Sequence, residues 1–143
     1  MGPDQSRLAA LQRRRIRKAR APKLVAAWAL AGVAASVLSD VRHDGIVEQL
    51  RGSDTRTRAV GSLQSILAEL AGDGDMVLIV GWGIDNEPAL LIRSDALAGA
   101  GASLRMLYPD GFLAADQPVT RALIVDFDDS DFHVDEVRLT ARG

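Results

Sequence analysis

The sequence predicts an α+β fold, in which N-terminal helices at about 4–20, 23–41 and 55–71 pack on a C-terminal antiparallel sheet of about 4–5 strands. Three observations predict this class. Apolar residues before residue 72 recur at the spacing of helices, whereas those after residue 75 form short β-branched runs. Turn residues divide these later runs, which is typical of hairpins. Helices and strands are segregated along the chain, which favours α+β over a parallel α/β fold.

The first predicted helix begins at Asp4, whose side chain can accept hydrogen bonds from the free amides of a first turn. It ends at Ala21-Pro22, because the residue before a proline resists the helical region. Its apolar stripe is thin, so the helix is marginal in water unless the body or a partner supports it. We therefore divide the chain into a basic helical arm, 1–22, and a single α+β domain, 23–143.

The second predicted helix, 23–41, is rich in alanine and apolar on nearly all sides, which indicates burial in a core, an oligomer or a membrane. Residues 24–39 follow a basic block, as the positive-inside rule requires of a membrane anchor. The run is shorter than the ~20 residues that a bilayer needs, and Asp40 ends it. The sequence thus favours a buried helix over an anchor, and it leaves homo-oligomerisation through residues 24–41 open.

The third predicted helix, 55–71, follows a short helix at 45–50 that Asp44 can cap. Asp54 is a plausible cap for the third helix, and Gly72 can end it. The third helix has the clearest periodicity of the chain, which is carried by Val60, Leu63, Ile66, Leu67 and Leu70.

The predicted strands are short apolar runs, bounded by turn residues. The first two pair as a hairpin, and the last two pair as another. A small-residue linker or short helix separates the second strand from the third. The strands lie at 76–81, 89–93, 104–108, 119–127 and 132–139.

Charge divides the chain into two parts. Residues 1–23 hold eight Lys and Arg residues against Asp4, a net charge of +7. Because the whole chain carries −2, residues 24–143 carry −9. The near-neutral total therefore hides a basic arm on an acidic body, and each part suits a different partner.

The basic arm predicts an alternative function in nucleic-acid binding. Clustered guanidinium groups bind phosphate and release counterions. Cations that surround a helix suit contacts along the phosphate backbone of a nucleic acid better than recognition of individual bases. The same arm could instead contact the protein's own acidic body or a second subunit. The candidate phosphate-binding residues are Arg13, Arg14, Arg15, Arg17, Lys18 and Arg20.

The acidic body carries a run of carboxylates at Asp126, Asp128, Asp129 and Asp131. Such carboxylates can bind a divalent cation, but an EF-hand loop that begins at Asp126 needs Gly where Asp131 stands and Glu where Val137 stands. We therefore predict no metal site. An acidic surface would instead steer a basic protein partner, and would resemble the phosphates of a nucleic acid.

Three aromatic residues, Trp82, Tyr108 and Phe112, are candidate partner-binding anchors if they are exposed, because aromatic anchors dominate binding energy. A core role for Trp82 is equally compatible with the sequence. Trp82 lies between two glycines, but no glycine-rich nucleotide-binding motif occurs in the chain. We therefore expect no cofactor.

Catalytic chemistry has little support in the sequence. Cysteine is absent, which excludes disulfides and a thiol nucleophile and fits a reducing, cytoplasmic compartment. The two histidines, His43 and His133, lack the spacing of a general acid and base pair. Ser39, Asp40 and His43 lie within about one helical turn, but no third group is placed to orient the histidine. We therefore predict no catalytic residue and no enzyme.

The sequence predicts a small non-enzymatic protein that engages a protein partner through an acidic surface. An immunity or antitoxin-like role is one such function. The first alternative is a nucleic-acid-associated protein that binds phosphate through residues 13–20. The second alternative is a membrane-anchored accessory protein with residues 24–41 as its anchor. The composition, with arginine in place of lysine and abundant alanine, is typical of a GC-rich, bacterial genome.

Overall fold

The computed structural model describes residues 3–51, 56–72, 75–97, 99–116, 119–128 and 131–139. Its helices are α1 (Pro3–Leu30), α2 (Asp40–Arg51), α3 (Leu63–Ala71), α4 (Ser94–Leu97) and α5 (Gly101–Leu107). Its strands are β1 (Ala35–Val37), β2 (Arg56–Arg58), β3 (Met76–Gly81), β4 (Ala89–Arg93), β5 (Gly111–Ala115), β6 (Arg121–Phe127) and β7 (Phe132–Arg138).

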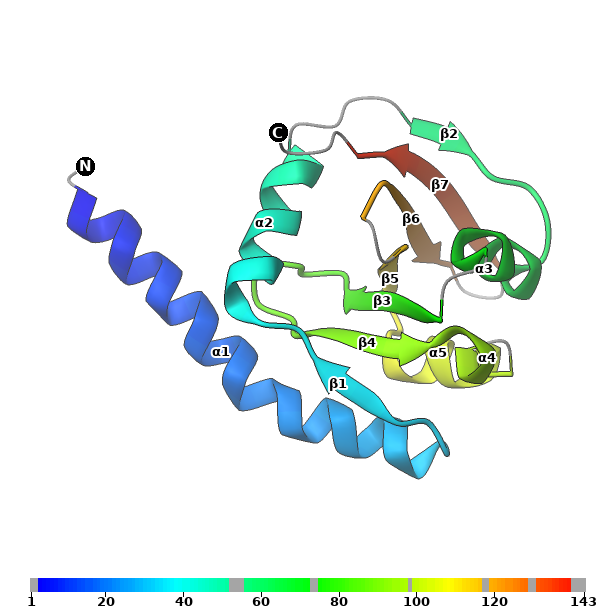
Figure 1. The fold of residues 1–143 in the computed structure, drawn as a ribbon, viewed down its shortest axis with the longest axis horizontal. Coiled ribbons are helices and arrows are strands. Elements are labelled where there is room, and N and C mark those ends of the chain that lie inside the picture. The colour runs from blue at the N-terminus through cyan, green and yellow to red at the C-terminus, as the bar shows by residue number, and fades with distance from the viewer. Residues whose placement is uncertain are drawn as a thin grey trace.

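The strands form one antiparallel sheet in the order β1-β4-β3-β5-β6-β7-β2 (Figure 1). The α+β class is therefore confirmed, and the described residues contribute seven strands instead of four or five. Hairpins β3–β4 and β6–β7 pair as the sequence predicts. The two three-residue edge strands, β1 and β2, pair with β4 and β7 respectively.

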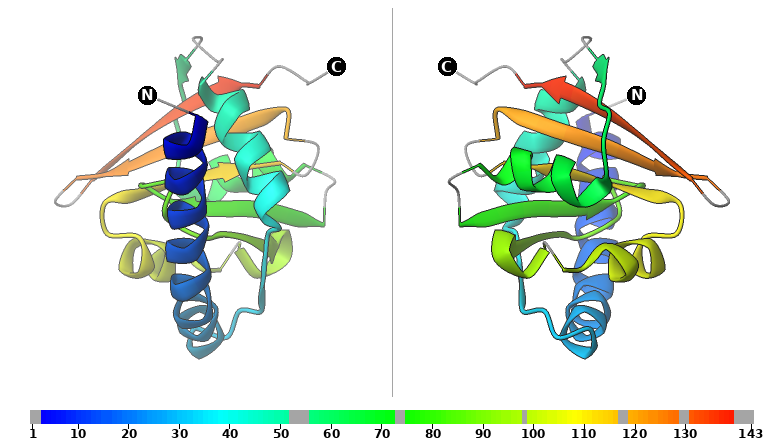
Figure 2. Two further views of the ribbon diagram at one scale, coloured as in Figure 1. Left: turned by 90° about the vertical axis from the view of Figure 1, so that its left-hand side faces the viewer. Right: turned by 90° about the vertical axis from the view of Figure 1, so that its right-hand side faces the viewer.

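The two faces of the sheet are covered unequally. Side chains alternate between the faces along each strand, so Ile79 and its neighbour Val80 belong to different apolar clusters. Helices α3, α4 and α5, together with Trp28 of α1, pack on the Ile79 face. Helix α2 packs on the Val80 face through Ile46 and Leu50. Figure 2 shows α1 and α2 on one side of the molecule and α3, α4 and α5 on the other. We call the Val80 side the open face.

Helix α1 is continuous through Pro22, so the predicted break at Ala21-Pro22 is wrong. The proline removes one backbone hydrogen bond, but packing holds the helix on both sides of it. Arg17 lies buried before the proline and Trp28 lies fully buried after it. The division into an arm and a domain stays a prediction, although one helix crosses its boundary.

The predicted helix at 23–41 is also wrong beyond Leu30. Gly32 adopts a φ of +83°, a left-handed conformation that ends helices, and the Val33 amide donates to the Trp28 carbonyl oxygen over 2.9 Å. The chain then forms β1 and restarts as α2 at Asp40. In the described part of the chain, no helix combines the length and the apolar character needed to cross a membrane.

Two further boundaries differ from the prediction. The predicted helix at 55–71 is replaced by β2 and the shorter α3. Gly61 adopts a φ of +134° between them, and the Ser62 side chain caps α3 by accepting a hydrogen bond from the Ser65 amide over 3.1 Å. Residues 54 and 55, where the prediction placed its cap and first helical residue, lie outside the described residues.

The predicted strand at 104–108 is wrong, because most of it belongs to α5. Leu104 and Tyr108, four residues apart, are both buried against the sheet. The strand that was not predicted, β5, begins directly afterwards at Gly111. Gly111 has a φ of +122°, and a Cβ atom there would collide with the Val125 carbonyl oxygen of β6. A glycine is therefore required where β5 enters the sheet.

Candidate functional site

Three arginines of α1 form ion pairs with the body of the protein. Arg14, Arg17 and Arg20 recur every third residue, which places them on one side of the helix. The Nη2 atom of Arg14 lies 2.8 Å from Oδ2 of Asp44 on α2. Arg20 pairs with Glu87, with 2.6 Å between Nη1 and Oε1. Part of the +7 charge is therefore balanced within the molecule.

Arg17 forms the centre of this contact. Only 4% of its surface is exposed. Its Nη2 atom lies 3.0 Å from Oδ1 of Asp44 and 3.1 Å from Oδ1 of Asp40. Its Nη1 atom donates to the Asp85 carbonyl oxygen over 3.1 Å, whereas its Nε atom has no hydrogen-bond partner among the residues that the structure describes. A buried guanidinium held by two carboxylates fixes α1 against α2.

The same contact sets the charge states of its neighbours. Burial alone would raise the pKa of Asp44, but hydrogen bonds from Arg14 and Arg17 outweigh it, and the pKa is lowered. His43 is buried, and loss of water around its ring lowers its pKa although the Ile84 carbonyl oxygen, 2.6 Å from Nε2, favours the charged form. We therefore expect His43 to be neutral at pH 7.

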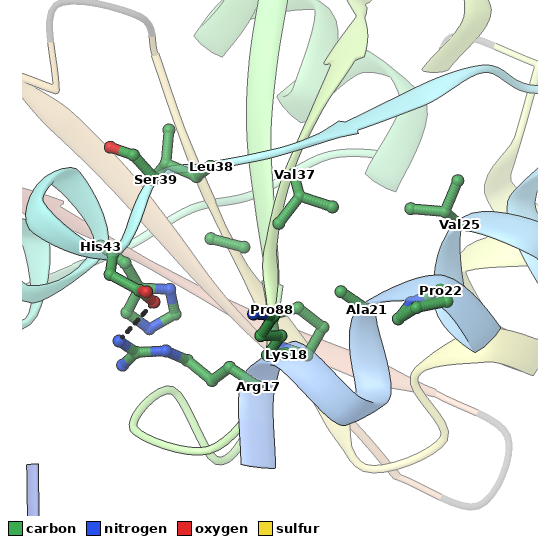
Figure 3. A pocket seen from close by; sticks show the side chains of 12 residues that line it. Arg17, Lys18, Ala21, Pro22, Val25, Val37, Leu38, Ser39, His43 and Pro88 are labelled. Carbon is green, nitrogen blue, oxygen red and sulfur yellow. Dashed lines mark hydrogen bonds and ion pairs between the residues drawn. The ribbon is translucent and has the colours of Figure 1, made fainter. Parts of the chain in front are cut away.

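A pocket of about 510 Å³ opens beside Arg17, between α1, β1 and the start of β4 (Figure 3). Its walls are mostly apolar, and Ser39 and His43 lie at one end. Figure 3 shows the Ser39 side chain pointing away from the His43 ring. The Nε2 atom of the ring contacts the Ile84 carbonyl oxygen, and Ser39 Oγ accepts a hydrogen bond from the Arg42 amide over 3.4 Å.

The open face brings together residues that the sequence separates. Gly81 pairs with Phe112, and Gly111 pairs with Asp126, which in turn pairs with His133. Alternation along β6 puts Asp126 on the same face as Ile124 of the open-face cluster. Trp82, one residue beyond β3, therefore lies at the same end of this face as Asp126.

An apolar hollow of about 250 Å³ lies on the open face next to these residues. Trp82 is 50% exposed and forms one wall. The hollow combines residues from α2, four strands and the β3–β4 turn, and it is lined by Leu50, Gly81, Trp82, Ile84, Leu113, Ile124 and Val137.

The acidic run lies partly beside the hollow. Asp126, Asp128 and Asp131 are exposed at the end of hairpin β6–β7, whereas Asp129 lies outside the described residues. Arg105 of α5 supports this end from the covered side, because its guanidinium lies 4.9 Å from the Phe127 ring centre and donates to the Asp128 carbonyl oxygen. The carboxylates therefore project from a supported hairpin.

The other two predicted anchors lie in the core. Phe112 is fully buried, and Tyr108 is almost so. The Tyr108 hydroxyl accepts a hydrogen bond from Nε1 of Trp28 over 3.2 Å, and its ring stacks obliquely between Trp28 and Phe112. Trp82 is the one predicted aromatic anchor that the fold exposes.

The remaining predicted phosphate-binding residues form no ion pair with Asp40 or Asp44 in the described part of the chain, although Lys18 lines the pocket beside Arg17. Arg15 and Lys18 are exposed and Arg13 is half-buried, and none of the three forms an ion pair within the described part of the chain. The six predicted cations thus divide into three that form ion pairs with the body and three that form none among the described residues.

Some functional residues were missed by the sequence analysis. The hollow depends on Leu50, Leu113 and Ile124, which come from separate elements and share no motif. Alternation within β6 is the one local signal, because it places Ile124 and Asp126 on a common face. Among the described residues, no group of three His, Asp or Glu side chains is arranged to hold a metal ion.

The chain matches no protein-family model, no curated protein and no solved structure. The fold and its surfaces define a small α+β protein with an apolar and acidic sheet face at one end and a partly neutralised basic helix along one edge.

Proposed function

We propose that this protein is a non-enzymatic binding protein that engages a basic protein partner through the open face of its sheet. One observation carries the proposal. Strand register brings exposed Trp82 and exposed Asp126 to the same end of one face, beside an apolar hollow. An exposed aromatic beside an apolar hollow and carboxylates is the arrangement expected of a protein-binding hot spot.

The apolar part supplies affinity. A partner side chain that enters the hollow would cover Leu113 and Ile124 and would pack on the indole of Trp82. Truncation of an aromatic anchor at the centre of an interface typically costs about 2 kcal/mol or more of binding free energy. Trp82 is well placed to be this anchor, because the hollow shields one side of its ring.

The acidic part selects the partner. Asp126, Asp128 and Asp131 are exposed at one end of the open face, and Asp110 lies in a second hollow that also contacts Trp82. The nearby cation Arg58 is already paired with Asp135, over 3.1 Å. A negatively charged surface attracts lysine- and arginine-rich proteins. Inhibition of a nucleic-acid-binding protein, as immunity proteins and antitoxins do, is a function that suits it.

Nucleic-acid binding by α1 remains the alternative. The internal ion pairs of Arg14, Arg17 and Arg20 reduce the charge that the helix offers to phosphate. Electrostatic affinity for a duplex depends on the number of phosphates neutralised. The proposal therefore favours the open face, and it assigns no phosphate-binding role to the three paired arginines.

The experiment is affinity capture by the full-length protein from an extract of the parent organism, with wild type and four variants as baits in parallel. Wild type is expected to retain a basic protein that Trp82→Ala and Asp126→Lys both fail to retain. The matched controls are Val60→Ala, an exposed apolar residue elsewhere, and Asp75→Asn, an exposed acid at the far end of β3. Both controls should retain the same protein as wild type.

Two outcomes would contradict the proposal. One is a retained protein that all variants hold equally, because its contact would then lie off the open face. The other is retention that depends on nucleic acid and disappears after nuclease treatment, which would favour the alternative function.

A further inference from the structure

The pocket of about 510 Å³ beside Arg17 has no role in the open-face proposal. We propose that this pocket binds a small organic acid, a monocarboxylate with an aliphatic tail. The volume lies in the range of about 300–1,000 Å³ that is usual for small-molecule sites. The proposal rests on the apolar wall of the pocket, on its buried polar end and on the ammonium group of Lys18, and it is independent of the open face.

The pocket is built between two elements that approach each other only in the folded chain. One side is a stretch of α1 between residues 17 and 25, and the other side is β1 with the residues that follow it (Figure 3). Pro88 and Ala89, at the start of β4, complete the wall. Because α1 passes through Pro22 without a break, Arg17 and Val25, about two turns apart, line the same pocket.

One end of the pocket is apolar. Figure 3 shows Ala21, Pro22 and Val25 of α1 grouped on the side of the pocket away from His43, with Val37 of β1 between the two groups. Val37 is 52% exposed, so this wall still offers apolar surface that a ligand can cover. Burial of an aliphatic tail here would gain about 25 cal/mol per Å² of apolar surface removed from water.

The other end of the pocket holds polar side chains that are already fixed in place. Arg17 and His43 both line the wall, and less than a tenth of either residue is exposed. Asp40 fixes the guanidinium group from one side, over 3.1 Å. The Nε–H donor of Arg17 lacks an acceptor among the described residues, so this end of the pocket favours an oxygen atom over an apolar group.

Lys18 supplies the charge that selects a carboxylate. The charge of Arg17 is balanced by the carboxylates of Asp40 and Asp44. Lys18 lines the same pocket, is exposed, and forms no ion pair within the ranges that the structure describes. The ammonium group is therefore left to attract an anion, and a monocarboxylate carries the matching single charge.

The edge of β1 offers a further donor beside the pocket. The Leu38 amide donates to the Ala89 carbonyl oxygen of β4 over 2.9 Å. Backbone groups of successive residues in an antiparallel pair point alternately toward and away from the partner strand, so the Val37 amide points away from β4. Since β1 is the last strand at its edge of the described sheet, that amide is left for a ligand oxygen.

The test is isothermal titration of the full-length protein with sodium octanoate, 1-octanol and sodium acetate. Octanoate is expected to bind at about one molecule per chain, as a single pocket requires. Octanol and acetate should each bind at least about tenfold more weakly, because octanol lacks the charge and acetate lacks the tail.

Two variants, each with a matched control, place the ligand in the pocket. Lys18→Glu should weaken octanoate binding at least about tenfold, because repulsion replaces attraction at the head group. Lys23→Glu changes an exposed lysine of the same helix outside the pocket and should bind as wild type does. Val37→Asp should weaken binding by a similar factor, whereas Val41→Asp, at an exposed valine of α2 outside the pocket, should not.

Circular dichroism of each variant without ligand separates loss of binding from loss of folding, since all the changed side chains are exposed. Absence of octanoate binding to folded wild type would overturn the proposal. Equal binding of octanoate and octanol would do the same, because the carboxylate would then have no contact. Equal weakening by Lys18→Glu and Lys23→Glu would also contradict it, because the effect would then come from the general charge of α1.

Discussion

Arg17 of α1 places its Nη2 atom 3.0 Å from Oδ1 of Asp44 of α2, with almost none of the arginine accessible to solvent. This pair joins the most basic segment of the chain to the acidic body. It also defines the orientation of α1, because the side of the helix that carries Arg17 also carries Trp28 into the core.

Replacement of Arg17 by methionine should destabilise the protein by about 2 kcal/mol, measured by urea denaturation. Loss of a buried partner leaves charges uncompensated, although Asp40 and Asp44 are partly exposed and water would offset part of the cost. Arg15→Met is the matched control, and should change the free energy of unfolding by less than about 0.5 kcal/mol. Equal effects of the two changes would show that Arg17 does not hold α1.

Acidification should destabilise the protein through His43. Burial lowers the pKa of this ring, so the unfolded chain binds a proton near about pH 6.5 while the folded chain does not. The unfolded state then holds more protons, and the free energy of unfolding falls as pH drops below about 6.5. The pKa of Asp44 is also lowered, and its protonation reduces the free energy of unfolding further only below about pH 4.

The measurement is urea denaturation at several pH values between about 5 and 7.5. His43→Gln should remove much of the dependence in that range, whereas His133→Gln, at an exposed site, should retain it. A stability that rises on acidification would contradict a buried, neutral His43.

Tyr108 should titrate far above an ordinary tyrosine. Burial raises its pKa to about 12, and it is the sole tyrosine of the chain, so tyrosinate absorbance reports it alone. Because the unfolded chain loses this proton near about pH 10, stability should decline as pH rises from there toward the folded pKa. In denaturant the midpoint should return to about 10. A folded-state midpoint near 10 would place the hydroxyl in water.

Pro22→Ala should stabilise the protein by about 2 kcal/mol, because it restores the backbone hydrogen bond and relieves the ring clash inside α1. Thermal denaturation measures the gain. Pro109→Ala, in the exposed turn before β5, is the control and should give no gain. A loss of stability at position 22 would mean that the proline sets a bend that the packing of α1 requires.

The sequence predicted four of the strands, because each carries its own apolar pattern and turn boundaries. Strand β5 was missed because Gly111 resembles a turn residue, and its role in the sheet depends on contact with Val125 across the strand pair. Strands β1 and β2 were missed because they pair with distant β4 and β7. Local propensity contains no information on such pairing, and β1 lies in an alanine-rich stretch that resembles a helix.

The candidate site was predictable only in part. Trp82 and the carboxylates were identifiable as residue types, but their common face follows from the register of strands that are far apart in sequence. Tyr108 and Phe112 were equally plausible anchors, and only tertiary packing places them in the core. The inward side of α1 could not be predicted, because cations surround the helix and Pro22 indicated a break.

Trp82 gives the most direct test of the central claim. Isothermal titration of the captured and purified partner with wild type and Trp82→Ala compares the two dissociation constants. The open-face proposal predicts a loss of affinity of about thirtyfold or more, which corresponds to about 2 kcal/mol, with wild-type affinity in Val60→Ala. Equal dissociation constants for wild type and Trp82→Ala would contradict the proposal.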